Sequence, residues 1–145
     1  MTSAMEDAHI LMSMTYASRA NPDVSAKDFN EILHQAQLNN AANGITGMLT
    51  FNKDYFLQTI EGPRAQINRL LYSLIADPRH YDLQVIETRE LKHRTWSKWS
   101  MNYASPTEKN AAIYLKYSTT IDFNPYLLSA ESARNLMSEL SDQHD

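Results

Sequence analysis

Apolar and polar residues alternate over the first part of the chain, which predicts a half-buried β-strand at residues 9–16. Ser13 and Thr15 belong to the polar face of this strand. A helix is predicted next, because Ser25 is a good N-cap and the apolar residues after it recur every three or four positions. That helix should end near Asn43-Gly44, where glycine can adopt the left-handed conformation.

Two short apolar runs follow, at 45–51 and 55–60, and the polar residues between them are typical of a β-hairpin. A second helix is predicted from Pro63, because proline is well tolerated where a helix begins, and it should end at Pro78. Two more strands are expected, at about 83–88 and 96–103.

The order of these elements is β-α-β-β-α-β-β, which predicts an α+β protein with a ferredoxin-like sandwich. Its five-stranded mixed sheet should carry both helices on one face, where their apolar stripes are buried. Two short helices are expected after Ser105, at 107–116 and 129–140, and they should pack on the free face of the sheet. The expected organisation is an N-terminal extension at 1–8, a core at 9–104 and a C-terminal helical cap at 105–145.

Composition and charge narrow the classes of function. The chain has 145 residues, a formal net charge of −4 and no cysteine, which excludes a disulfide scaffold, a thiolate metal site and a cysteine nucleophile. Its histidines show no metal-ligand spacing, so no metal site is expected. An acidic chain is also a poor match for non-specific DNA binding, which requires a basic face. The basic and aromatic segment at 92–99 is therefore interpreted as a solvated turn that leads into a buried strand.

Targeting and membrane signals are not expected in this chain. No apolar run approaches the ~20 residues that cross a bilayer. Residues 1–8 carry no basic residue, whereas secretory and mitochondrial signals are basic. The sequence therefore predicts a cytoplasmic protein.

Three polar positions are not explained by an ordinary core. Gln58 lies mid-strand among apolar neighbours, where a buried amide must be hydrogen-bonded; the alternative is a glutamine on an exposed edge. Asn39 and Asn40 lie near the end of the first helix, where they could cap it or bind a planar heterocycle that carries carbonyl and N–H groups. The hydroxyl of Tyr16 needs a partner, which could be Gln58 or water.

Five short segments along the chain carry a more specific signal when they are taken together in order. They are YASR at 16–19, NNAANGITGML at 39–49, FLQTIEG at 56–62, DPRH at 77–80 and WSM at 99–101. In this order and spacing they resemble the BLUF family, the blue-light sensors that use flavin. The resemblance covers about residues 10–103.

The resemblance implies a light-driven change in a hydrogen-bond network. Tyr16 matches the photoactive tyrosine of the family, and Gln58 matches the glutamine between that tyrosine and the flavin. Trp99 and Met101 match the residues that relay the signal. Light would move an electron and a proton from Tyr16, and the Gln58 amide would then rearrange.

The resemblance also implies a set of flavin-binding residues. Asn40 matches the asparagine that holds the C4 carbonyl and N3 edge of the ring, and Asn39 occupies the neighbouring position, which can reach the C2 carbonyl. One departure is Ser73, where some members place an arginine near the phosphates. The remaining expected contacts are Ile32 and Phe56 against the ring, and Arg79 and His80 near the ribityl and phosphate groups.

The function that the resemblance implies is a photoreceptor, not an enzyme. FAD is the expected cofactor, with FMN and riboflavin as alternatives. The expected partner is an unidentified downstream protein, with a homo-oligomer left open and with no nucleic acid and no membrane. Two other classes of function stay open, a flavin-dependent redox enzyme and a light-insensitive module that binds another small molecule.

Overall fold

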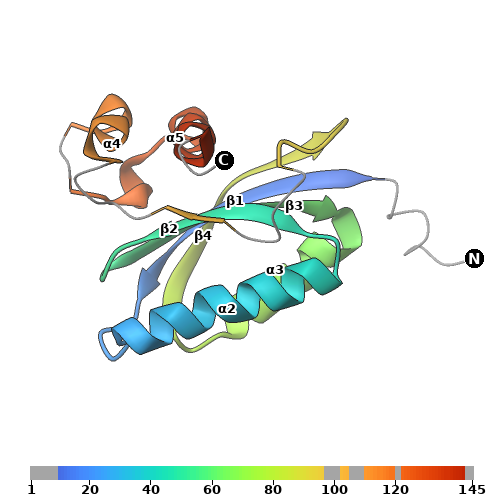
Figure 1. Ribbon diagram of the computed structural model, residues 1–145, viewed down its shortest axis with the longest axis horizontal. Helices are drawn as coiled ribbons and strands as arrows, with labels where there is room; N and C mark the ends of the chain where they lie inside the picture. The colour runs from blue at the N-terminus through green and yellow to red at the C-terminus, as the bar shows by residue number, and fades with distance from the viewer. Residues whose placement is uncertain (1–9, 97–101, 105–109, 120–121, 143–145) are drawn as a thin grey trace, which may run out of the picture.

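The computed structural model describes residues 10–96, 102–104, 110–119 and 122–142, and for 102–104 it describes the backbone alone. A central sheet separates two layers of helices, as Figure 1 shows, with α2 and α3 on one face and α4 and α5 on the other. The strands are β1 Leu11–Ala20, β2 Thr46–Phe51, β3 Tyr55–Pro63, β4 His80–Leu91 and β5 Asn102–Ala104. The helices are α2 Ala26–Ala42, α3 Arg64–Ala76, α4 Ala111–Tyr117, the short 3₁₀ helix η2 Pro125–Leu127 and α5 Ala130–Asp142.

The sheet has five strands in the order β4-β1-β3-β2-β5. Its first four strands are antiparallel to their neighbours, whereas β5 runs parallel to β2. The prediction of a mixed sheet with two helices on one face is confirmed, and the fold is a ferredoxin-like α+β sandwich. Because β1 and β3 lie at the centre of the sheet, each is hydrogen-bonded to a strand on both sides.

Helix boundaries agree with the predicted caps. Ser25 accepts a hydrogen bond from the backbone N–H of Asp28 at 3.3 Å, and the Asp28 carboxylate accepts one from the backbone N–H of Ser25 at 2.9 Å, which is a capping box. Gly44 follows the helix with a φ of 69°, the left-handed conformation expected there. Helix α3 begins directly after Pro63.

Two strand predictions need correction. Strand β4 runs from His80 to Leu91, beyond the predicted 83–88, because it pairs with nearly the whole length of β1. The described part of β5 is Asn102–Ala104, and Trp96, where that strand was predicted to begin, lies in no strand. The reason is that the Glu61 carboxylate accepts the backbone N–H groups of Thr95 and Trp96, at 2.7 and 3.3 Å, so a side chain takes the donors that a strand would use.

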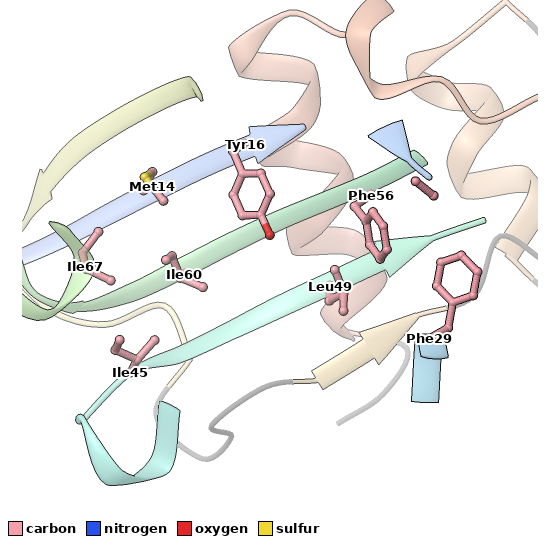
Figure 2. Packing of buried hydrophobic residues seen from close by; sticks show 9 residues of the cluster. Met14, Tyr16, Phe29, Ile45, Leu49, Phe56, Ile60 and Ile67 are labelled. Carbon is pink, nitrogen blue, oxygen red and sulfur yellow. The ribbon is translucent and has the colours of Figure 1, made fainter. Parts of the chain in front are cut away.

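Both faces of the sheet are buried, because successive residues of a strand point to opposite sides. The cluster under α2 and α3 is shown in Figure 2, where Tyr16, Leu49 and Phe56 rise from three different strands on one face. The opposite face packs against the cap, defined here as α4, η2 and α5. The buried members of that second cluster include Met48, Leu57, Trp96, Tyr114, Leu136, Met137 and Leu140.

Among the helices in the described part of the chain, none combines the length and the apolar character needed to span a bilayer.

Candidate functional site

A cleft lies between α2, α3 and the sheet, and it holds about 670 Å³ of empty space, part of it open to solvent. Its lining comes from β1, β2, β3, both helices and the start of β4. The lining residues are Tyr16, Ile32, Gln35, Ala36, Asn39, Leu49, Phe56, Gln58, Leu70, Ser73, Leu74, Asp77, Arg79 and His80.

Tyr16 and Gln58 form the polar part of the sheet surface in this cleft. They are directly opposite each other in the antiparallel pairing of β1 and β3, and Leu49 on β2 is opposite Gln58 on its other side. Tyr16 is 3% exposed and Gln58 is 4% exposed. Gln58 is therefore a buried amide on a central strand, and the alternative of an edge-exposed glutamine is wrong.

The Tyr16 phenol is held in its neutral form. Burial raises the pKa of Tyr16 above its ordinary value, and the negative charge of Asp77 raises it further. The His80 ring packs edge-on against the phenol ring, with the ring centroids 6.4 Å apart. The Tyr16 phenol therefore keeps its proton throughout the neutral pH range.

Apolar side chains form the walls of the cleft. Ile32 from α2 and Phe56 from β3, the two predicted ring-packing residues, both line it, and Leu49, Leu70 and Leu74 extend the apolar surface. Helical spacing explains the α2 wall, because Ile32, Gln35, Ala36 and Asn39 recur at intervals of three and four residues and so share one face.

The two asparagines at the end of α2 have different positions. Asn39 is exposed and lines the cleft, while its backbone carbonyl accepts a hydrogen bond from Asn43 Nδ2 at 2.8 Å. Asn40 is 1% exposed and is not among the lining residues. Its backbone carbonyl accepts the N–H groups of Asn43 and Ile45, at 3.1 and 2.9 Å, so it also ends the helix. One helical residue of rotation, about 100°, accounts for the difference between the two side chains.

The mouth of the cleft carries a charged pair. Arg79 Nη2 lies 2.6 Å from Asp77 Oδ2 and donates a second hydrogen bond to Gln35 Oε1 at 3.1 Å. Burial alone would raise the pKa of Asp77, but the hydrogen bonds from Arg79 outweigh it and hold that pKa below its ordinary value. Ser73 also lines the cleft, at the position where some members of the resembled family have an arginine.

His80 links two elements of the site. Its Nε2 donates to the Leu74 carbonyl at 2.5 Å, and its Nδ1 lies 2.7 Å from Ser18 Oγ. The imidazole therefore holds the end of α3 against β1, with its ring at the cleft. Arg79 and His80 both line the cleft.

Some lining residues were not predicted as site residues. Gln35 could have been found from its spacing of three residues from Ile32 on one helix face. Leu70 and Leu74 could have been found in the same way on α3, where Ser73 shares their face. Two other predicted residues, Trp99 and Met101, lie outside the described residues.

Comparison with protein families agrees with this architecture. The family model named BLUF, sensors of blue-light using FAD, matches residues 11–102. The chain belongs to the BLUF family. Among the described residues, every predicted site residue except Asn40 lines the cleft in the matched region.

Individual BLUF relatives show how this domain is used elsewhere. The photoactivated adenylate cyclase subunit beta of Euglena gracilis is 33% identical over 105 residues, which are 72% of this chain and 12% of that protein. The chain therefore spans a small part of this relative. The solved structure of the BlsA photo-activated state matches with a TM-score of 0.81 and 28% identity, over 90% of this chain and 94% of that one. The dark-state structure of the BLUF protein BlrB matches with a TM-score of 0.75 and 30% identity, over 92% and 99%.

The residues of the cleft fit the flavin that BLUF proteins use. The apolar walls suit a flat aromatic ring, and the amide groups of Asn39 and Gln58 suit its carbonyl and N–H edge. Arg79 at the mouth offers donors to a polar tail, although it is already paired with Asp77, and both ring nitrogens of His80 are engaged by Leu74 and Ser18.

Proposed function

We propose that this protein is a blue-light receptor that binds FAD non-covalently in the cleft between α2, α3 and the sheet. One observation carries the proposal, which is that Tyr16 and Gln58 are opposed on the two central strands and both line the cleft while buried. FMN and riboflavin are alternatives to FAD, because the residues that would hold the ring are the same for all three.

The binding residues have distinct roles in this proposal. Ile32 and Phe56 pack on the ring, and Gln58 and Asn39 hydrogen-bond its polar edge. We assign the C4 carbonyl and N3 edge to Asn40, which requires its buried amide to face the cleft from the end of α2. Arg79 and His80 contact the ribityl and phosphate groups.

Tyr16 and Gln58 carry the light response. The flavin, when bound, supplies absorption of blue light and one-electron oxidation of a nearby phenol. Tyr16 then gives up an electron and the proton on Oη, and regains both. The Gln58 amide can present either Oε1 or Nε2 to a neighbour, so a rotated or tautomerised amide changes the hydrogen bonds in the cleft without any net reaction.

The output of the receptor is a changed interaction with another protein. We propose a cytoplasmic sensor with no catalytic activity of its own, which acts on an unidentified downstream protein, with self-association left open. Trp99 and Met101 would relay the change from Gln58. The strands that carry Tyr16 and Gln58 also contact the cap, because their alternate residues face it.

The decisive experiment is an absorption spectrum of the purified protein in darkness and directly after blue light. A flavin spectrum that shifts slightly to the red and recovers in darkness supports the proposal. A flavin band that bleaches instead favours a redox enzyme. A colourless protein that cannot be reconstituted with flavin favours a module for a different small molecule.

A further inference from the structure

A second cavity lies on the opposite face of the sheet, between β1, β3, β4 and helix α5. It holds about 620 Å³ of empty space, part of it open to solvent, and polar side chains supply most of its lining. Figure 1 shows that α5 lies on one side of the sheet and that α2 and α3 lie on the other. This second cavity, called the cap-side cavity, is therefore separate from the cleft between α2, α3 and the sheet.

A buried carboxylate lies in the cap-side cavity. Glu61 is 2% exposed, and its Oε1 accepts the backbone N–H groups of Thr95 and Trp96 at 2.7 and 3.3 Å. A carboxylate offers about four acceptor positions, so Glu61 can accept hydrogen bonds from further donors. A cationic N–H donor is the complement that a buried negative charge requires.

One residue that lines the same cavity carries a buried donor that lacks an acceptor. Trp96 is 7% exposed and lines the cavity, and its indole Nε1 has no hydrogen-bond partner among the described residues. Leaving a buried N–H unpaired is costly, and such groups in native proteins call for a specific explanation. An oxygen acceptor supplied from outside the chain would satisfy this donor.

The lining of the cavity includes two guanidinium groups, those of Arg89 and Arg134. Arg134 on α5 is neutralised by Glu87, which accepts its Nε and Nη2 at 3.1 and 2.9 Å. Arg89 also lines the cavity and is exposed, and its positive charge helps to lower the pKa of Glu87, but it forms no hydrogen bond within the part of the chain that the structure describes. A guanidinium in this state is suited to bind a carboxylate.

These three groups together point to a zwitterion. The geometry points to the cap-side cavity as a binding site for a small molecule of the amino acid class. Its ammonium group donates to Glu61, and its carboxylate accepts from Trp96 Nε1 and from Arg89. The site takes its specificity from requiring both charges in one small ligand.

Residues that line the cap-side cavity are adjacent in the chain to residues that line the cleft between α2, α3 and the sheet. Thr15 and Thr59 line the cavity with their hydroxyls 2.8 Å apart, and the next residue of β1 and the preceding residue of β3 are Tyr16 and Gln58. A ligand in the cavity therefore acts on the strands that hold the photoactive pair. This coupling rests on the proposed function, and it would change the rate of dark recovery.

Binding can be tested in darkness on the full chain as it is purified. The chain has two tryptophans, so Trp99→Phe leaves Trp96 as the one source of an indole N–H signal in a ¹H–¹⁵N correlation spectrum. The probes are the free L-amino acids, titrated singly to millimolar concentration into the full chain. We expect at least one of them to shift the Trp96 indole signal in a saturable way.

Two substitutions and one control decide the assignment. Glu61→Gln and Arg89→Gln should each weaken binding at least about tenfold, because each removes one charged partner. Arg89→Gln changes an exposed side chain, so it keeps the test valid if Glu61→Gln fails to fold. Glu90→Gln, on an exposed neighbour outside the cavity, should leave the affinity unchanged.

The inference is overturned if no amino acid moves the indole signal, which would mean that the cavity holds water only. It is also overturned if the shift survives in both substituted proteins. Because this readout is independent of colour and light, a protein that fails as a photoreceptor can still pass or fail this test.

Discussion

The guanidinium of Arg19 lies over the ring of Tyr126, with Cζ 4.4 Å from the ring centroid. Arg19 comes from the end of β1 and Tyr126 from η2, so the contact joins the sheet to the cap. Arg19 Nε also donates to Asp82 Oδ2 at 3.1 Å, and Tyr126 Oη donates to the Asp82 carbonyl at 2.6 Å. Asp82 has a φ of 53°, a left-handed conformation that aspartate tolerates better than most residues.

Tyr126→Phe should destabilise the protein by about 0.5–1.5 kcal/mol, because it removes the hydrogen bond to the Asp82 carbonyl and keeps the ring under Arg19. Urea unfolding measures the loss. Tyr72→Phe is the matched control, since Tyr72 is 72% exposed on α3 and its change should be neutral. Equal stabilities for the two variants would show that this hydrogen bond does not hold the cap.

Leu136→Ala should cost about 2–5 kcal/mol, because Leu136 is 1% exposed in the cluster between α5 and the sheet. The same change at Leu127, which is 80% exposed on η2, should stay within about 0.5 kcal/mol. Thermal unfolding of both variants provides the measurement. A small loss at Leu136 would contradict a cap that is packed as part of the core.

Gly62→Ala should destabilise the protein by about 1–3 kcal/mol, because an added Cβ would lie 3.0 Å from the Gly44 carbonyl oxygen and 3.0 Å from Ile45 Cγ1. These atoms follow the end of α2, so flavin affinity should fall as well. Gly44→Ala distinguishes the cost of a steric clash from the cost of an unfavourable backbone conformation. Its Cβ would meet nothing closer than 3.8 Å, but its φ of +69° is left-handed. Its expected cost is about 1 kcal/mol. A larger loss of stability for Gly44→Ala than for Gly62→Ala would contradict the steric explanation of the Gly62→Ala effect.

Tyr16→Phe should abolish the light-induced spectral shift while flavin remains bound, because the ring still fills its place and the ionisable hydroxyl is gone. Absorption spectra before and after blue light provide the measurement. Tyr81→Phe serves as the control, because Tyr81 is 50% exposed on β4, and it should keep a normal shift. A normal spectral shift in Tyr16→Phe would contradict the assignment of Tyr16 as the photoactive residue.

Stability should fall at alkaline pH in a way that depends on Tyr16. The folded-state pKa of Tyr16 is raised above the ordinary value of 10.0 by burial and by Asp77, so folding favours the neutral phenol. This contribution is complete below about pH 10 and is lost as the pH rises toward the folded pKa. Urea unfolding from about pH 8 to about pH 11 should therefore show a shallower decline for Tyr16→Phe. Burial raises the pKa of Tyr126 to about 12, so part of the decline should remain in that variant.

Local patterns were sufficient for much of the fold, because the signals involved are short-range. The Ser25 capping box, the hairpin between β2 and β3 and the start of α3 after Pro63 are each determined by a few adjacent residues. Tyr16 and Gln58 could be placed on one face by alternation alone. Their direct opposition could not, because strand register depends on the whole pairing of β1 with β3.

The errors arose where distant residues decide the structure. Trp96 was expected to begin a strand, but Glu61 takes up the backbone donors at that point. Arg94 was expected in a solvated turn, yet its guanidinium donates to the carbonyls of Gly44 and Glu61, at 2.6 and 3.2 Å. The different positions of Asn39 and Asn40 were also hidden in the sequence, because both amides suit a ligand equally well.

The central position of β1 and β3 has a consequence for how the backbone opens. Both strands are hydrogen-bonded on each side, so their amide protons should exchange with solvent only when the whole domain unfolds. In the described part of the chain, strand β5 has three residues and pairs with β2 alone, so its amides should exchange far earlier. A response that begins at Tyr16 and Gln58 therefore has to leave through side chains, with the main-chain ladder around them intact.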